Sequence, residues 1–491
     1  MQEVSLPPKH VQWKPYQPEM LAHLHANPKA LLFVEMGLGK TVVVLKYIDD
    51  LLTGGESRGV LFCSPLRVKQ ITIPEQCRTW IHSSWMKVVD MSTPEGEKAW
   101  NEGGADLYLT HYDVLASREV TRKCPKCKGK KCSECDGGYV TNKYPGFAEK
   151  FMKGRKQLPV DTVVYDEISK FKAHDGTRAK AIRAYHHHFS RIVGLTGSPL
   201  GNSRLNLFNQ VRMVDGGERL GPSFHAFRQR YAESDYMGYK WEMRPGAAEK
   251  IDEKIADIAL VLLNKDHANL PPCYFEDIEV TLPASAVAHY KKIEKELLLE
   301  LEKGDIVALN AAVLAGKMLQ ITGGACYGDD KEVHHLHTAK VDALKKLRTK
   351  LGPKEPLIVL ASFKHETARL LEALPGSKVF HKDDMAAWQS GKIHTIIADA
   401  RSIGFGVDGL QTTCANMVFF TPYWSAEVVQ QVIKRIHRLG NPRDTYIWRL
   451  IATIPGKVTI DEVVIESNRL HTEEQETMLA SLKTLQRLNQ K

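Results

Sequence analysis

The residues with the most distinctive chemistry lie between positions 30 and 41, where an apolar run leads into a glycine turn that ends in Lys-Thr. A strand, a glycine turn and a helix in this order cradle phosphate groups, because glycines let backbone N–H groups approach the ligand. Lys40 would reach the β and γ oxygens of a nucleotide, and the Thr41 hydroxyl would hold Mg²⁺. The residues expected to contact the nucleotide here are Gly37, Leu38, Gly39, Lys40 and Thr41.

An acidic pair follows a second apolar run, at residues 162–165. Asp166 would anchor Mg²⁺ through its water shell, and Glu167, pointing to the other side of the strand, would polarise an attacking water. Each motif alone is also compatible with an ordinary turn. Together they predict a site that hydrolyses a nucleotide.

Four of the nine cysteines form two Cys-x-x-Cys pairs, at Cys124, Cys127, Cys132 and Cys135. Four thiolates at this spacing can wrap one tetrahedral Zn²⁺, and the surrounding lysines would offset its excess negative charge. Disulfides and a redox-active pair are the alternatives; an intracellular setting disfavours the first, and two clustered pairs disfavour the second. The basic residues around the cluster would contact phosphates, or would simply be solvated around a loop that zinc folds. They are Arg122, Lys123, Lys126, Lys128, Lys130, Lys131 and Lys143.

Length and composition indicate a soluble protein of several domains. The chain has 491 residues and a net charge of +9, which favours a polyanionic partner without identifying one. No apolar run reaches the length of a membrane-spanning helix, and the first residues lack a signal-peptide pattern. We therefore expect a cytoplasmic protein with no membrane partner.

The elements that must position these residues alternate between apolar strands and helical stretches, which predicts an α/β fold with parallel sheets. Strands are expected at 31–35, 59–63, 87–90, 106–109, 162–165 and 191–195, and again at 357–360, 378–380, 395–398, 417–420 and 445–450. The cysteine-rich stretch at about 118–158 interrupts the first series as an insertion. Between about 205 and 335 the pattern is helical and charged.

The order of the motifs resembles that of the Swi/Snf-type branch of superfamily 2 helicases, DNA translocases with two RecA-like lobes. In the first lobe the resemblance covers Tyr16 and Gln17 (the adenine-reading motif Q), 35–41 (motif I), 64–66 (Ia), 109–112 (Ib), 166–169 (II) and 194–199 (III). Motif II departs from the family pattern, since Ile-Ser replaces the familiar Ala-His after the two carboxylates.

In the second lobe, residues 431–440 resemble motif VI, and 404–411 are a divergent motif V with an additional glycine and an acid. Arg435 and Arg438 stand three apart on a predicted helix and would share one face. As arginine fingers they would meet the charge that develops on the γ-phosphate, and Gln431, one turn back, would orient water or a phosphate.

The resemblance also implies a domain organisation of the compact phage and bacterial type. Lobe 1 is expected at 1–225, the zinc-binding insertion at 118–158, Swi/Snf-type helical insertions and a linker at 226–335, lobe 2 at 336–470 and a C-terminal helix at 471–491.

The function implied is that of an ATP-dependent translocase on double-stranded or branched DNA that uses ATP, Mg²⁺ and Zn²⁺, in the cytoplasm of a bacterium or a phage-infected cell. Remodelling, branch migration and annealing all stay open, as does a replication or recombination protein partner. An RNA-directed or strand-separating helicase is the alternative within the same class. A nucleotide-switched binding module is the alternative from another class.

Overall fold

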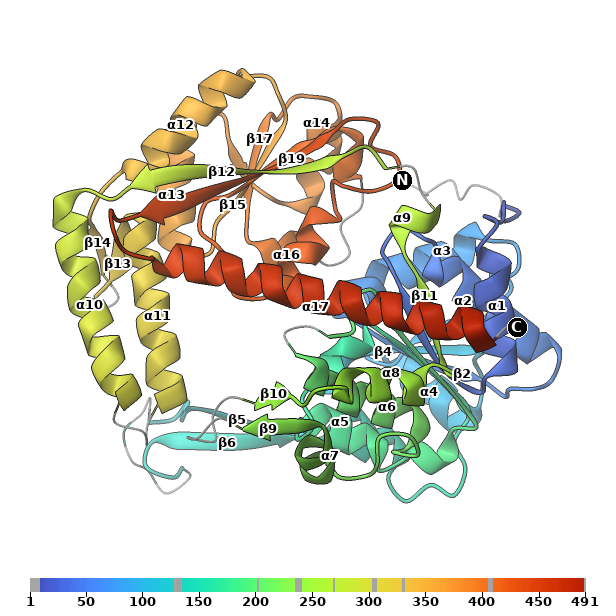
Figure 1. The fold of residues 1–491 in the computed structure, drawn as a ribbon. Coiled ribbons are helices and arrows are strands. Elements are labelled where there is room, and N and C mark those ends of the chain that lie inside the picture. Colours follow the sequence, from blue (N-terminus) through green and yellow to red (C-terminus); the bar gives the residue numbers. More distant parts are fainter. Residues whose placement is uncertain are drawn as a thin grey trace. The chain divides into compact units, whose positions relative to one another are not determined.

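The fold is seen in a computed structural model that describes residues 9–127, 130, 132, 135–200, 203–234, 241–267, 270–302, 307–328, 332–404 and 409–489. The chain divides into two compact units, each built on one large sheet (Figure 1). The first unit comprises Met1–Leu263 and Gln475–Lys491, and the second comprises Asn264–Glu474. This division does not test the domain boundaries that we predicted from the sequence, and those boundaries stay a prediction.

The first unit contains a seven-stranded sheet in the order β11-β1-β8-β7-β2-β4-β3, and every pairing in it is parallel. Its strands are β1 Lys29–Val34, β2 Val60–Ser64, β3 Val88–Asp90, β4 Leu107–His111, β7 Thr162–Asp166, β8 Arg191–Thr196 and β11 Ala259–Leu262. Six of them confirm the strands predicted from apolar runs. The seventh, β11, lies in the stretch that was predicted to be helical, so that prediction was wrong here.

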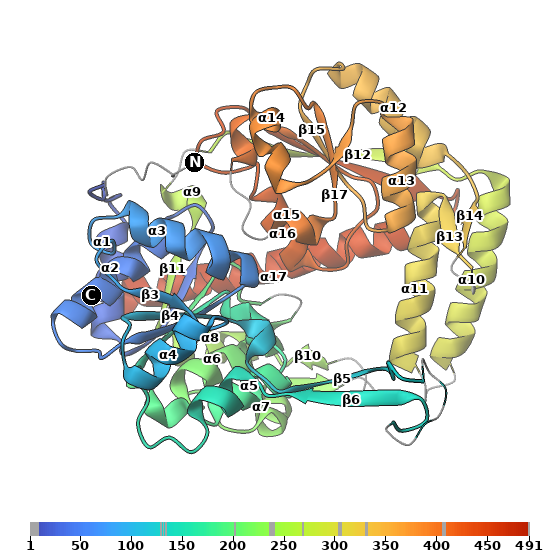
Figure 2. The ribbon, with the colours of Figure 1, turned by 180° about the vertical axis from the view of Figure 1, so that it is seen from behind.

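Helices cover both faces of this sheet (Figures 1 and 2). Successive side chains of a strand point to opposite faces, and accordingly Leu32 and Val34 pack in one core while Leu31 and Phe33 pack in the other. The helices of the unit are α1 Gln17–Ala26, α2 Lys40–Thr53, α3 Ile73–Thr79, α4 Pro94–Glu102, α5 Thr177–Arg183, α6 Leu207–Asp215, α7 Phe224–Tyr231 and α8 Ala247–Ile255. A two-stranded sheet of β9 Ala232–Ser234 and β10 Trp241–Met243 follows α7.

The predicted insertion is carried by an antiparallel hairpin that projects from the body of the first unit (Figure 2). Its strands are β5 Arg118–Lys123 and β6 Tyr139–Tyr144, and all six residues of β5 are exposed. At the base of the hairpin, a Cβ atom on Gly146 would lie 2.3 Å from the backbone carbon of Ala116. Only glycine therefore permits this close approach of the two chain segments.

The second unit has a six-stranded parallel sheet in the order β12-β19-β18-β15-β17-β16. The strands are β12 Cys273–Thr281, β15 Leu357–Leu360, β16 Lys378–Val379, β17 Thr395–Ala398, β18 Asn416–Phe419 and β19 Thr445–Thr453. The helices beside them are α9 Asn264–His267, α12 Ala339–Leu351, α13 Lys364–Ala373, α14 Met385–Gln389, α15 Ala400–Gly404 and α16 Ala426–Ile433. Five strands confirm the prediction, whereas β12, like β9, β10 and β11, is a strand within the stretch predicted to be helical.

Long helices do occur in that stretch: α10 Ala284–Glu302 packs against α11 Val307–Gly323, and a short hairpin of β13 Ala325–Tyr327 and β14 Val333–His335 follows. The last helix, α17, covers Ile460–Asn489. Across the described part of the chain, no helix has both the length and the apolar character that a bilayer crossing requires.

A buried ion pair ties the elements of the second unit together. The ammonium of Lys340 in α12 lies 2.5 Å from the carboxylate of Asp461 in α17, and neither side chain is exposed. Thr322 donates a second hydrogen bond to this carboxylate and the backbone N–H of Ala452 a third. Because the charge is both paired and hydrogen-bonded, it can be buried without a large penalty.

Candidate functional site

Three motif segments of the first unit come together at one edge of its sheet. The glycine turn follows β1, Asp166 ends β7 and Glu167 follows it, and Thr196 ends β8, which lies between those two strands. The carboxyl ends of neighbouring parallel strands form the ligand-binding edge of an α/β sheet. The backbone of Gly197 accordingly packs beside the glycine turn, where an added Cβ would lie 3.4 Å from the carbonyl oxygen of Val34.

The turn after β1 has the backbone that a phosphate cradle needs. Gly37 and Gly39 have φ angles of 90° and 77°, in the left-handed region that glycine adopts without strain. The helix α2 then begins at Lys40, so its first N–H groups face the turn. The Lys40 ammonium donates hydrogen bonds to the carbonyl oxygens of Val34 at 2.5 Å and Glu35 at 3.2 Å. It is thus held within the turn, where phosphate oxygens would arrive.

Gln17 supports this turn from the side. It is buried, its Oε1 accepts a hydrogen bond from the backbone N–H of Lys14 at 2.9 Å, and its Nε2 donates to the carbonyl oxygen of Leu38 at 3.3 Å. A Cβ on Gly39 would lie 2.4 Å from this Nε2, so a side chain there would displace the Gln17 amide from the turn. The expected role of Gln17 in reading adenine stays a prediction.

The acidic pair has an unusual backbone. Strand β7 ends at Asp166, and Glu167 follows with φ 60° and ψ 58°. Among the described residues other than glycine, Glu167 is the only one with a positive φ. Glu167 is therefore not a strand residue pointing to the opposite side, as the sequence analysis expected. It is buried, and the Thr196 hydroxyl donates a hydrogen bond to its carboxylate at 3.2 Å. The backbone N–H of Ser198 in turn donates to that hydroxyl at 3.1 Å.

The electrostatics of the pair favour a cation. Desolvation raises the pKa of Asp166 above its usual value and the neighbouring charge of Glu167 raises it further, while the Lys40 ammonium and a backbone hydrogen bond from Glu167 oppose this shift. Two crowded carboxylates are stabilised as anions by a divalent metal. Together with the half-buried hydroxyl of Thr41, this donor set of hard oxygens fits Mg²⁺.

The second unit places motif VI differently from the prediction. Helix α16 ends at Ile433, so Arg435 and Arg438 lie in the turns after it and do not share a helical face. Ile436, in these turns, is fully buried in the core of the unit. Asn441 then donates hydrogen bonds to the carbonyls of Ile436 and Cys414, which fixes the turn toward β19.

The two arginines lie outside the helix but can still serve as cations. The guanidinium of Arg435 donates to the carbonyl oxygen of Gly404 from Nε at 3.0 Å and from a terminal nitrogen at 2.6 Å, and Arg438 is half-buried. Gln431 lies on α16 and is buried. Its Nε2 donates a hydrogen bond to the Glu427 carboxylate at 3.4 Å, while its Oε1 accepts no hydrogen bond from the described chain. The divergent part of motif V, at 405–408, lies outside the described residues.

The four cysteines form the predicted cluster at the tip of the β5–β6 hairpin, with their sulfur atoms all within 4.8 Å of one another. The distances are 3.8 Å for Cys124 to Cys132, 3.5 Å for Cys127 to Cys135 and 3.4 Å for Cys132 to Cys135. A tetrahedral Zn²⁺ with bonds of about 2.3 Å would hold its sulfur ligands about 3.8 Å apart. Hydrogen bonding, first from the backbone of Cys127, lowers the pKa of Cys124 to about 7, which favours the thiolate that binds metal.

The cluster is therefore compatible with zinc. Exposed cations on the adjoining strand β5 include Arg118, Arg122 and Lys123, and Lys143 is exposed on β6. Lys128 and Lys131 of the predicted basic surface lie outside the described residues.

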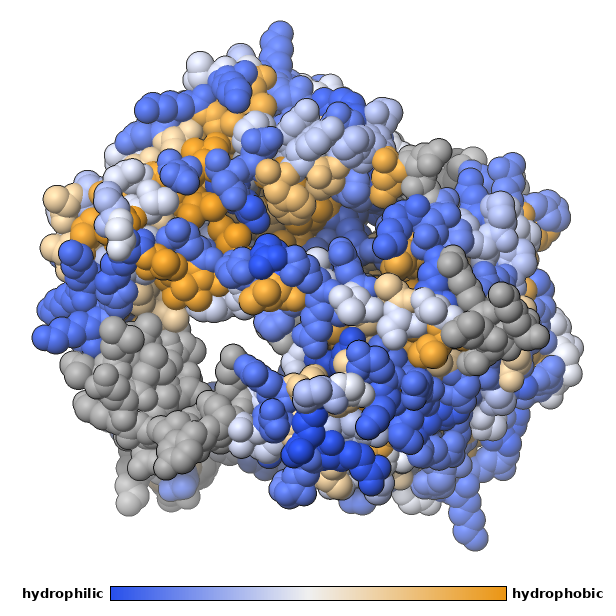
Figure 3. All heavy atoms as spheres, viewed as in Figure 1, coloured by the Kyte–Doolittle hydropathy of each residue, from blue (hydrophilic) through white to orange (hydrophobic). Residues whose placement is uncertain are grey.

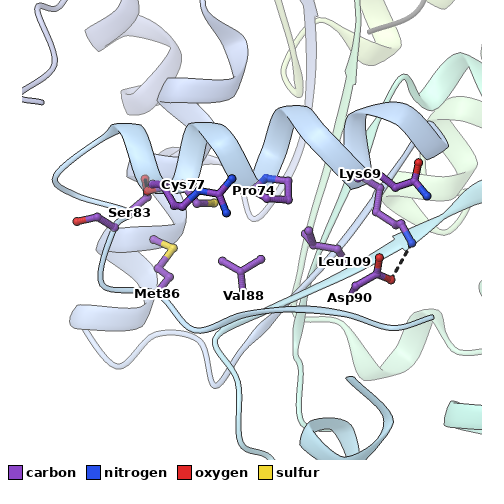
Figure 4. Close-up of a pocket in the computed structure, with 11 residues that line it drawn as sticks. Lys69, Pro74, Cys77, Ser83, Met86, Val88, Asp90 and Leu109 are labelled. Atoms are coloured by element: carbon purple, nitrogen blue, oxygen red, sulfur yellow. Dashed lines mark hydrogen bonds and ion pairs between the residues drawn. The ribbon is translucent and has the colours of Figure 1, made fainter. Parts of the chain in front are cut away.

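A cavity of about 410 Å³ beneath α3 carries no sequence signal beyond its position after motif Ia (Figure 4). It is lined partly by apolar groups, including Met86, Val88 and Leu109. Its buried cation, Lys69, lies 2.7 Å from the carboxylate of Asp90. Because this charge is already neutralised inside the fold, the cavity is a poor candidate for an anion site.

Comparison with known proteins places the chain in a family. The model of the SNF2-related domain matches residues 16–322, and the chain belongs to this family. It is 31% identical over 490 residues to the putative protein p41 of Acyrthosiphon pisum secondary endosymbiont phage 1, covering 96% of this chain and 98% of that protein. The resemblance to the Swi/Snf branch, and the fold class of two parallel-sheet units with helical insertions, are thereby confirmed.

More distant relatives are described as ATP-dependent helicases. The chain is 24% identical over 318 residues to MG018 of Mycoplasma genitalium, covering 62% of this chain, and 22% identical over 500 residues to the putative helicase/translocase YwqA of Bacillus subtilis, covering 93%. It spans only 29% and 48% of their lengths. The SWI2/SNF2 ATPase core of Sulfolobus solfataricus in complex with dsDNA aligns over 98% of both chains, with 17% identity and a TM-score of 0.43.

We expect Lys40→Ala and Glu167→Gln both to abolish steady ATP hydrolysis, but to differ in nucleotide binding. Lys40→Ala should weaken Mg-ATP binding because it removes a phosphate contact. Glu167→Gln should still bind Mg-ATP and lose at least ~10²-fold in turnover, as loss of a general base does. Turnover and nucleotide affinity are measured together, with Glu95→Gln, an exposed acid on α4, as control; near-normal turnover in either variant would contradict the assignment.

Metal analysis of the purified chain should find one zinc per molecule. Replacing Cys127 and Cys132 by Ser should release it, since two of four thiolate ligands are lost, whereas Cys326→Ser, in β13 and outside the cluster, should retain it. Zinc that persists in the double variant would show that these cysteines are not its ligands.

Proposed function

We propose that this chain is an ATP-dependent translocase that acts on double-stranded DNA. The observation that carries the proposal is the meeting of the glycine turn, the acidic pair and Thr196 at the ends of three neighbouring parallel strands. A binding module that merely senses a nucleotide needs no buried carboxylate positioned by a hydroxyl. The SNF2 family and the ATP-dependent helicases among the relatives support the same function.

The residues of the first unit divide the work of hydrolysis. Lys40 and the N–H groups at the start of α2 bind the phosphates, while Thr41 and Asp166 would hold Mg²⁺, which would supply positive charge to neutralise the phosphates. Glu167 accepts the proton of the attacking water through its carboxylate. The hydrogen bond from Thr196 keeps that carboxylate in position. Hydrolysis can therefore change the position of the chain segment that follows β8.

The second unit supplies the remaining cations. Arg435 and Arg438 stabilise the charge that develops on the γ-phosphoryl group, and Gln431 orients a water or a phosphate oxygen. Each cycle of hydrolysis then moves the protein along the DNA backbone.

The charge distribution supports a nucleic acid such as duplex DNA as the partner. The net charge is +9, and exposed cations stand along the β5–β6 hairpin. Contacts of this kind follow the phosphates and carry no base specificity. If the zinc-free cysteine variant kept full DNA affinity, the hairpin would be structural or would bind a protein.

Replacing Arg435 or Arg438 by Ala should reduce turnover far more than ATP affinity, because their role is in the transition state. A loss on the order of 10³-fold per arginine is expected for this role. Arg401→Ala, at an exposed position on α15, is the matched control. Loss of ATP affinity with little change in turnover would contradict the assignment of arginine fingers.

Hydrolysis should be stimulated by duplex DNA, and the stimulation should weaken as salt rises, since phosphate contacts release counterions. The decisive measurement compares ATP turnover with duplex DNA, single-stranded DNA and duplex RNA at one salt concentration. A clear preference for RNA or for single strands would favour the RNA-directed or strand-separating helicase. Nucleotide binding without turnover under any condition would favour the binding module.

A further inference from the structure

A second cavity of the first unit, of about 430 Å³, is lined by cations and lies between α5, α6 and α7. We call it the basic pocket. The side chains that matter for its chemistry are Lys180, Arg183, Arg212, Arg228, His174 and Phe224. Asp175 is the single carboxylate among the lining residues. The pocket therefore has a strong excess of positive charge.

The four cations are not neutralised inside the fold. Within the described chain none of them forms an ion pair, and the Nε atoms of Arg212 and Arg228 are buried without a hydrogen-bond acceptor. The guanidinium groups of Arg183 and Arg212 repel each other: burial lowers the pKa of Arg183, and the charge of Arg212 lowers it further. Buried donors and uncompensated cations both indicate that a ligand with anionic oxygens belongs here.

Aromatic groups hold the pocket in shape. The guanidinium of Arg228 lies 4.0 Å from the ring centre of Trp241 and 5.6 Å from that of Phe224. Phe224 is in turn stacked on His174, with ring centres 3.8 Å apart and planes at 17°. A guanidinium held by its faces keeps its N–H edges directed at an acceptor, which suits planar recognition of phosphate.

A chain of hydrogen bonds connects the basic pocket to the acidic pair. Arg183 donates to the side-chain oxygen of Asn209 at 3.3 Å, and the Asn209 amide donates to the carbonyls of Phe171 and Ala173. Phe171 ends the short helical segment that begins directly after Glu167. An anion bound by Arg183 would thus restrain the segment that carries the candidate general base.

We propose that the basic pocket binds a phosphate of the DNA backbone, outside the nucleotide site, through Lys180, Arg183, Arg212 and Arg228. The proposal rests on the proposed function, because it takes DNA as the substrate. Backbone phosphate and free phosphate compounds share this chemistry. The exposed positions of Lys180, His174 and His225 favour the backbone, since an open rim admits a polymer. Figure 3 agrees: its most hydrophilic surface gathers where Figure 1 draws α7 and β9.

The test replaces Lys180 or Arg212 by Gln and measures the affinity for a short duplex DNA as a function of salt. Each variant should lose about eightfold in affinity at 0.1 M salt, and its log–log salt slope should fall by about 0.9, as expected for one lost phosphate contact. Lys98→Gln, an exposed cation on α4, is the charge-matched control and should change neither quantity. Lys180 is also exposed, so its replacement tests the pocket even if Arg212→Gln unfolds, which thermal melting would reveal.

The outcomes separate this inference from the proposed function. Wild-type protein that neither binds duplex DNA nor responds to it would refute the function itself. Wild-type binding with unchanged affinity and slope in Lys180→Gln would overturn the pocket alone. A parallel arm measures tripolyphosphate binding: if Lys180→Gln loses that binding but keeps full DNA affinity, the pocket takes a free phosphate compound and the backbone assignment is wrong.

Discussion

The parallel pairing of β8 with both β1 and β7 is the constraint on which the candidate nucleotide site depends. Gly194 lies in the middle of β8, opposite Leu31 on one side and Tyr165 on the other. A Cβ there would lie 2.5 Å from the side chain of Ile168 and 2.9 Å from that of Leu31. Gly194 thus leaves room for the side chains of Ile168 and Leu31 beside the sheet. The backbone pairing of β8 with β1 and β7 holds the three strand ends in register.

The rigid frame of the three strands can hold the acidic pair in a strained backbone conformation. A left-handed non-glycine residue costs about 1–3 kcal/mol and persists only where its surroundings determine it. Glu167 has this backbone, is buried, and is held by the Thr196 hydroxyl at the end of the neighbouring strand. The turned backbone leaves the Glu167 carboxylate close enough to Asp166 for its charge to raise the pKa of that carboxyl. The proposed roles, Asp166 at the metal and Glu167 at the water, depend on this arrangement.

The sequence predicted what depends on local pattern and missed what depends on tertiary context. Long apolar runs identified eleven strands, and the cysteine spacing identified the metal cluster. Four apolar residues at Ala259–Leu262 read equally well as a helix or a strand, because so short a run has no distinctive period. The turns at Arg435 and Arg438 are fixed by the hydrogen bonds of Asn441, which have no local signature in the sequence. The basic pocket could not be predicted either, because its residues come from three helices that only the folded chain brings together.

The way the fold treats its cations distinguishes scaffold from site. Lys69, Lys340 and Arg204 are each buried, and each lies within 2.7 Å of a carboxylate, those of Asp90, Asp461 and Asp252 respectively. A charge paired in this way is satisfied before any ligand arrives. In the basic pocket the cations face one another instead, and keeping them together costs free energy in the absence of an anion. The fold pairs its other buried cations with its own carboxylates. We therefore attribute the unpaired cations of the basic pocket to an anion that comes from outside the chain.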